Sequence, residues 1–153
     1  MRTPRTAVLN VALLALLAAI VPVTAAVAGS SGNAKLCKAL ARVGSLDLEF
    51  QEVIESPSWD EVRDSIDEVG PRLNRAWKAV VRRIPDDQRK DARLVARFTK
   101  EALVVFGEAD SLDEASAALL GVDDAIDAGL ASARLEEFSQ DECGVSINNE
   151  GEL

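Results

Sequence analysis

Apolar residues recur every three or four positions through most of residues 33–140, and no long stretch alternates between apolar and polar positions. A repeat near 3.6 residues is typical of α-helices that bury one face. The first stripe consists of Leu36, Leu40, Val43, Phe50 and Ile54. This pattern predicts a helix over about 34–55, with Asn33 as its cap and Pro57 just past its end.

A second predicted helix starts with the residues SWDE at 58–61, whose spacing is typical of a capping box. The same spacing recurs at 111–114. The apolar stripe continues over 59–84 without a change of phase, although Gly70 and Pro71 lie in its middle. A proline inside a helix removes a hydrogen bond and usually bends the axis, so we expect one kinked helix. Two collinear helices, one ended by Gly70 and one begun by Pro71, are the alternative.

Three further helices are predicted in the second half of the chain. The first spans about 86–106 and ends at Gly107. A short helix over 112–120 and a last helix over about 122–140 follow it, with Gly121 between them.

Four main helices with short connections pack most simply as an up-down-up-down four-helix bundle. The second helix of this all-α bundle is kinked at Gly70-Pro71, and the fourth is split at Gly121. We therefore expect one helical domain over 29–140 and a frayed C-terminal tail, tethered by its cysteine, over 141–153.

The first 28 residues have the organisation of a secretory signal peptide. Arg2 and Arg5 form its positive region, residues 7–21 are almost wholly apolar, and small residues at 26–28 suit cleavage. The apolar run of about 15 residues is shorter than the ~20 that a membrane-spanning helix needs. We expect cleavage after Ala28 and no membrane span in the mature chain.

The charge balance narrows the classes of partner. The whole chain has 17 Lys and Arg, 26 Asp and Glu and no His, for a net charge of −9. Loss of Arg2 and Arg5 with the signal makes the mature chain −11. Such a charge favours solubility and a monomer, and it disfavours non-specific binding to nucleic acid. The expected location is the extracellular space or the cell wall.

The two cysteines are Cys37 and Cys143. A zinc site needs about four ligands and a catalytic thiol needs a base, and the chain has no histidine for either. An oxidising compartment and an even number of cysteines favour a disulfide. In an up-down-up-down bundle the first helix begins at the end where the fourth finishes, so we predict a Cys37–Cys143 bond. Free or intermolecular thiols are the alternatives.

Positive charge is concentrated in one segment. Residues 71–100 hold ten basic and three acidic residues, a net of +7, while the rest of the mature chain has a net of −18. Two interpretations stay open. The basic helix hairpin pairs with the acidic first and fourth helices, or it presents an anion-binding patch to a phosphate-rich wall polymer, a lipid headgroup or an acidic protein. The candidate patch residues are Arg75, Arg82, Arg83, Arg89, Lys90 and Arg93.

The tryptophans and a cluster of aspartates are assigned structural roles, not ligand-binding ones. Trp59 and Trp77 fall on the apolar stripe and are assigned to the core. Asp123, Asp124 and Asp127 lack the spacing of an EF-hand loop and are assigned to a helix N-terminus. The sequence predicts no metal site, no haem or other cofactor, and no nucleic-acid partner.

Four short stretches carry a resemblance to a known group of proteins. They are "AVAGSSG", "LCKAL", "VRRIPDDQRKDARLV" and "EEFSQDECG". Together they resemble the small secreted helical proteins of high-GC actinobacteria, over essentially the whole mature chain. The resemblance implies export and a helical fold, and it implies no activity or site residue.

We therefore expect a non-catalytic, secreted or wall-associated helical protein that acts by binding. The candidate partner of the basic hairpin is an anionic component of the envelope. A hydrolase that uses carboxylates is one alternative, although the lack of histidine and of catalytic motifs counts against it. A structural partner of another exported protein is the other.

Overall fold

The computed structural model describes residues 31–54 and 58–148, and every regular element in these two ranges is an α-helix. The predicted signal peptide, residues 1–28, lies outside them. The helices are α1 (Ser31–Ile54), α2 (Trp59–Val81), α3 (Arg89–Glu108), α4 (Leu112–Leu119) and α5 (Ala125–Cys143). The described chain is thus all-α, as its helical periodicity predicts. None of these helices is both long enough and apolar enough to cross a membrane.

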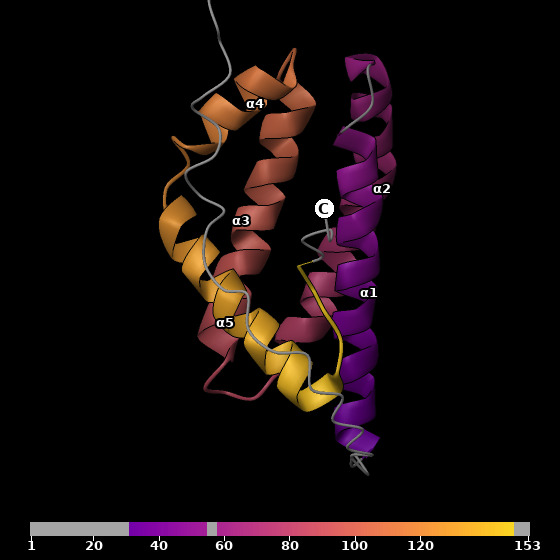
Figure 1. Ribbon diagram of the computed structural model, residues 1–153, viewed down its shortest axis with the longest axis vertical. Coiled ribbons are helices and arrows are strands. Elements are labelled where there is room, and N and C mark those ends of the chain that lie inside the picture. Colours follow the sequence, from indigo (N-terminus) through magenta and orange to yellow (C-terminus); the bar gives the residue numbers. More distant parts are fainter. Residues whose placement is uncertain (1–30, 55–57, 149–153) are drawn as a thin grey trace, which may run out of the picture.

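Each long helix contacts the next long helix along the chain, and the last one also contacts the first. α1 packs on α2, α2 on α3, and α3 on α5, while α5 also reaches α1. Figure 1 shows α1 and α2 side by side, α3 on the other side of the molecule, and α4 at the upper end of α3. α5 runs obliquely across the lower half and ends beside the start of α1 (Figure 1).

Two apolar clusters form the core. The larger lies towards the disulfide end and joins residues of all four long helices, among them Leu40, Leu73, Val95 and Leu135. The smaller lies under α4, where Phe50 and Phe106 meet edge to face with ring centroids 5.3 Å apart. Burial of these side chains is the main force that holds the helices together.

The Gly70-Pro71 pair lies inside one continuous helix, α2, which excludes the alternative of two separate helices. Gly70 packs against α3, where a Cβ at this position would meet the side chain of Leu103 at 3.5 Å. Pro71 is exposed, as is Asp67, whose carbonyl loses its helical partner to the proline ring. The missing hydrogen bond therefore falls on the solvent side of α2, and the helix continues through the proline.

Several helix ends differ from the prediction. α1 is already helical at Ser31, so Asn33 is not its cap. α3 begins at Arg89 rather than at residue 86, and it continues past Gly107 to Glu108. The physical reason at the first of these ends is that residues 85–88 form a separate turn closed by backbone hydrogen bonds.

The predicted capping boxes have different outcomes. At α4 the Ser111 hydroxyl accepts from the backbone N–H of Glu114, and the Glu114 carboxylate accepts from the N–H of Asp110. That box is formed, with the return contact one residue earlier than in the usual pattern. Ser58 is the N-cap of α2, but its side chain makes no capping hydrogen bond, so this detail of the prediction is wrong.

The Cys37–Cys143 disulfide is present, with the two Cα atoms 5.2 Å apart. It joins the second turn of α1 to the last residue of α5. The half-cystine at Cys143 packs against the larger apolar cluster. The prediction that the first and last long helices meet at the cysteines is therefore confirmed.

Residues 144–148, which follow α5 directly, are packed and not frayed, contrary to the expectation for this part of the tail. Gly144 adopts the left-handed conformation that favours glycine, with φ at 62°, and its N–H donates to the carbonyl of Gln140. The chain then turns back towards the middle of the molecule (Figure 1). Ile147 is only 1% exposed and belongs to the larger cluster. We call Gly144–Asn148 the C-terminal segment.

One carboxylate on α5 anchors the C-terminal segment. The backbone N–H groups of Ile147 and Asn148 donate to the same oxygen of Glu136, at 2.7 and 2.8 Å. The Asn148 side chain also exchanges hydrogen bonds with Ser132. Partial burial alone would raise the pKa of Glu136, but the hydrogen bonds from this segment and from Gln140 lower it below its ordinary value.

Replacement of both cysteines by serine should lower the free energy of unfolding by about 2–4 kcal/mol, because the bond removes conformational freedom from an unfolded loop. The joined residues are 106 positions apart. Urea denaturation followed by circular dichroism measures the change. A reductant should shift the wild-type midpoint and leave the double variant unaffected; an unchanged wild-type midpoint would contradict the prediction.

Ile147→Ala should cost about 2–4 kcal/mol of stability, since it leaves a void in the core. The matched control is Leu120→Ala, whose side chain is 86% exposed and whose loss should cost under about 0.5 kcal/mol. Denaturant unfolding of both variants provides the comparison. Equal stability of the two variants would mean that the C-terminal segment is not packed in solution.

The Glu136 anchor should make stability depend on pH in the acid range. Its folded pKa lies below the ordinary value of 4.5, so the stabilisation is complete above the unfolded pKa and is lost as the pH falls through the folded pKa. Glu136→Gln should be less stable than wild type at pH 7, and the difference should shrink below pH 4. A constant difference between pH 7 and pH 3 would rule out this role for the charge.

Candidate functional site

The basic residues lie on the antiparallel pair formed by α2 and α3. The contact between Gly70 and Leu103 fixes the register of the two helices. The C-terminal half of α2 therefore lies beside the N-terminal half of α3, and these two halves carry the positive charge. The structure thus brings together charges that are separated by a turn in the sequence.

Three of the predicted patch residues bind backbone carbonyls: two cap the end of α2, and the third binds Ile84, which lies beyond that helix. Arg82 donates to the carbonyl of Lys78, Arg83 to that of Ala79, and Arg89 to that of Ile84. The last carbonyls of a helix lack helical partners and carry partial negative charge, so cations are favourable there. Arg89 also pairs with Asp86. These arginines therefore have a structural role, which their positions in the sequence did not indicate.

Two cations of the basic segment pair with acidic helices, as the first interpretation expects. Arg72 on α2 binds both carboxylate oxygens of Glu49 on α1. Arg97 on α3 binds Asp124, the residue that precedes α5. Asp124 has a positive φ of 65°, a conformation that aspartate tolerates better than most residues.

A third ion pair runs in the opposite direction, from α5 to the basic segment. Arg134 on α5 donates two hydrogen bonds to Asp91 on α3, at 2.7 and 2.9 Å. These bonds lower the pKa of Asp91. Asp91, one of the three carboxylates of the basic segment, is therefore paired with a cation of α5 and not with a described cation of its own segment.

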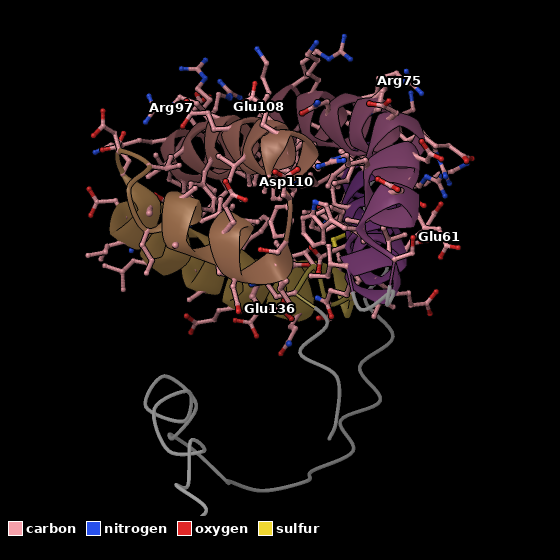
Figure 2. All side chains as sticks on the ribbon, turned by 90° about the horizontal axis from the view of Figure 1, so that it is seen from above. Glu61, Arg75, Arg97, Glu108, Asp110 and Glu136 are labelled. Atoms are coloured by element: carbon pink, nitrogen blue, oxygen red, sulfur yellow. A yellow bond between two sulfur atoms is a disulfide. The ribbon has the colours of Figure 1, made fainter. Side chains whose placement is uncertain are left out.

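The remaining cations are exposed and unpaired. They make no ion pair or side-chain hydrogen bond within residues 31–54 and 58–148, and they recur at helical spacing along α2 and α3. We call this set the basic face: Arg75, Lys78, Lys90, Arg93 and Lys100. Figure 2 places Arg75 on α2 and Arg97 on α3 along the same edge of the molecule, opposite Glu136 on α5.

The basic face overlaps only in part with the predicted patch. Arg75, Lys90 and Arg93 belong to both. Lys78 and Lys100 were not among the candidate residues, although their spacing of three from Arg75 and of seven from Arg93 was visible in the sequence.

A groove of about 560 Å³ adjoins the basic face between α3 and the start of α5. Its charged lining consists of four cations and three carboxylates: Arg89, Lys90, Arg93, Arg97, Asp86, Asp124 and Asp127. Arg89 and Arg97 are paired with two of these carboxylates. The groove is therefore close to electrical balance.

A second hollow, of about 270 Å³, lies between all four long helices and the C-terminal segment. We call it the central cavity. Its walls are largely apolar and include Val43, Leu73, Val95, Phe98 and Ile147. The polar side chains at its surface include Asp47, Trp77, Thr99, Ser132 and Asn148. This cavity was not predictable from the sequence, because its lining residues come from five separate segments of the chain.

The remaining sequence assignments concern metals and tryptophans. In the described part of the chain, no three metal-ligating side chains come together. Asp124 is the N-cap of α5 and Asp127 lies in its first turn. Trp77 is buried in the core, and Trp59 packs on Phe106 while its indole N–H donates to the carbonyl of Ala109.

Comparison of the chain with protein-family models, with curated proteins and with solved structures gave no match.

Proposed function

We propose that this chain is an exported, non-catalytic helical protein whose basic face binds a phosphate-rich polymer of the cell envelope. The observation that carries the proposal is a set of five exposed cations on α2 and α3 that have no partner in the described structure. The chain as a whole has a net charge of −9. Unpaired positive charge on one face of an acidic protein is then the feature that requires an explanation.

An extended anion suits this face better than a small one does. Small anions are held by several donors that converge in a pocket. In the adjoining groove, however, Arg89 and Arg97 already pair with aspartates, and Lys90 and Arg93 alone are unpaired among the described lining cations. The cations of the basic face instead follow two neighbouring helices. A polymer with regularly spaced phosphates can contact them one after another, each weakly.

The uneven distribution of charge also supports an orienting role. Residues 71–100 have a net of +7, and the rest of the mature chain has a net of −18. An anionic surface therefore attracts the α2–α3 side and repels the acidic sides. Binding through the basic face leaves α5 and the outer side of α1 turned away from the polymer.

Two features support an exported location. The N-terminal residues have the organisation of a signal peptide. The Cys37–Cys143 bond is of a kind that persists in oxidising compartments. Among the described residues, Asp47 is the one carboxylate that lines the central cavity, whereas acid–base hydrolysis by carboxylates uses a pair. This favours a binding role over the hydrolase alternative.

Removal of three basic-face charges should weaken binding to the polymer by about tenfold or more, equivalent to about 1.4 kcal/mol. The variant is Arg75→Ala, Lys78→Ala and Arg93→Ala. The matched control is Lys35→Ala, Lys38→Ala and Arg42→Ala, which removes three exposed cations of α1. Both variants should unfold at the wild-type denaturant midpoint, since none of these six side chains makes an ion pair or hydrogen bond within the described residues.

Binding is measured by co-sedimentation with isolated cell envelopes and by titration with inorganic polyphosphate. The proposal expects the basic-face variant to lose affinity in both assays, and the α1 control to remain within about twofold of wild type. Vesicles of phosphatidylglycerol test the lipid source of phosphate, and selective binding to them would replace the polymer with a membrane surface. Equal loss of affinity in both triple variants would contradict a role for this face.

A further inference from the structure

The central cavity is lined by a hydrogen-bond donor that has no partner in the described part of the chain. Trp77 is 4% exposed and lines the cavity, yet its indole N–H makes no hydrogen bond within the described residues. The indole nitrogen is not among the fully buried polar atoms that lack a partner, so this donor is accessible to solvent or to a ligand. The indole N–H of Trp59, in contrast, donates to the carbonyl of Ala109. An oxygen atom of a molecule in the cavity is an acceptor that Trp77 can reach.

The cavity also contains a carboxylate that has no cation. Asp47 is partly buried, and its side chain accepts a hydrogen bond from Gln51 at 2.8 Å. No Lys or Arg of the described residues forms an ion pair with it. Burial raises the pKa of Asp47, and the negative charge of Glu136 on α5 adds to the effect. A positively charged ligand would supply the missing countercharge.

From these two groups we infer that the central cavity binds a small apolar amine. Its ammonium group contacts Asp47, and its apolar body packs against Leu73, Phe98 and the ring of Trp77. Aromatic faces also attract an organic cation directly. A hydroxyl on the ligand accepts from the indole N–H of Trp77. This site is independent of the basic face, which takes ligands of the opposite charge.

The size of the cavity limits the ligand. A protein cavity of about 150 Å³ holds benzene, with six non-hydrogen atoms. By the same ratio, the 270 Å³ of the central cavity accommodates about eleven such atoms. The ligand is thus a single ring with a short amine-bearing chain, or an aliphatic body of similar size.

Three probes of nearly equal shape separate the contributions to binding. They are 2-phenylethylamine, its neutral analogue 2-phenylethanol, and 2-amino-1-phenylethanol, which carries both polar groups. Binding to the mature, disulfide-bonded protein is measured by isothermal titration and by NMR shifts of cavity residues. We expect the amine to bind at least about tenfold more tightly than the neutral alcohol, and the amino alcohol to bind most tightly.

Two substitutions assign the contacts. Asp47→Asn should weaken the two amines by about tenfold or more and leave 2-phenylethanol within about twofold. Asp64→Asn, an exposed aspartate on α2, is the control for the general attraction of cations to an acidic protein, and it should change none of the three affinities. Trp77→Phe should remove the advantage of the amino alcohol over the plain amine.

The inference is overturned if none of the probes shifts the resonances of cavity residues, or if amine and alcohol bind equally. It is also overturned if Asp64→Asn weakens the amines as much as Asp47→Asn does. Thermal unfolding of each variant shows whether it retains the native fold. Because Asp47→Asn keeps the size and the hydrogen bond of the side chain, a selective loss of amine binding identifies the charge itself.

Discussion

The Cys37–Cys143 bond closes the series of helices, and the rest of the structure depends on that closure. Consecutive long helices pack on each other along their lengths, but α5 contacts α1 less than it contacts α3. The disulfide lies at the place where α1 and α5 meet. Without it, α5 would be held mainly by α3 and the C-terminal segment, with few direct contacts to α1. The disulfide therefore holds α5 against α1, whereas extensive apolar contacts hold the other neighbouring helices together.

The C-terminal segment continues this closure into the interior. Gly144 reverses the chain directly after Cys143, and Glu136 then holds the next backbone amides. Ile147 completes both the larger apolar cluster and one wall of the central cavity. The cavity exists because the segment covers the space that the oblique α5 leaves between α1 and α3. The disulfide, the C-terminal segment and the cavity thus all result from the way α5 crosses the molecule and ends beside α1.

Charge divides the surface without determining the fold. Arg72 and Arg97 link the basic hairpin to its acidic neighbours. Arg82 and Arg83 bind carbonyls at the end of α2, and Arg89 binds the carbonyl of Ile84 in the connection to α3. The five cations of the basic face take part in none of these interactions and are unpaired in the described part of the chain. The two proposed ligands differ accordingly: an extended anion on the outside, and a small cation beside Asp47 on the inside.

The helices and the disulfide were predictable because both depend on short-range information. Helical periodicity and turn residues lie within a few positions of each other, and the pairing of Cys37 with Cys143 needs only the number of helices and the compartment. The start of α3 was missed because Pro85 and its two aspartates suit either a first turn or a separate turn. The sequence also does not show whether Ser58 uses its hydroxyl as a cap.

The cavity and the packed C-terminal segment were not predictable for a different reason. They depend on residues far apart in the chain: Glu136 binds Asn148, and Asp47 and Trp77 line the same cavity. In hindsight, Gly144 and Ile147 were the available signals: a glycine that ends a helix and one large apolar residue in a polar tail. The position of the basic segment was predictable from the sequence. Which of its residues bind backbone carbonyls and which are unpaired was not.

Amide hydrogen exchange of the oxidised and the reduced protein, at early labelling times, tests the closure most directly. If the disulfide holds α5 and the C-terminal segment against α1, reduction should accelerate exchange in the last two turns of α5 and at Ile147 and Asn148. The amides of α2 and α3 should keep their protection. Unchanged protection of α5 after reduction, or equal acceleration in all the helices, would contradict the account.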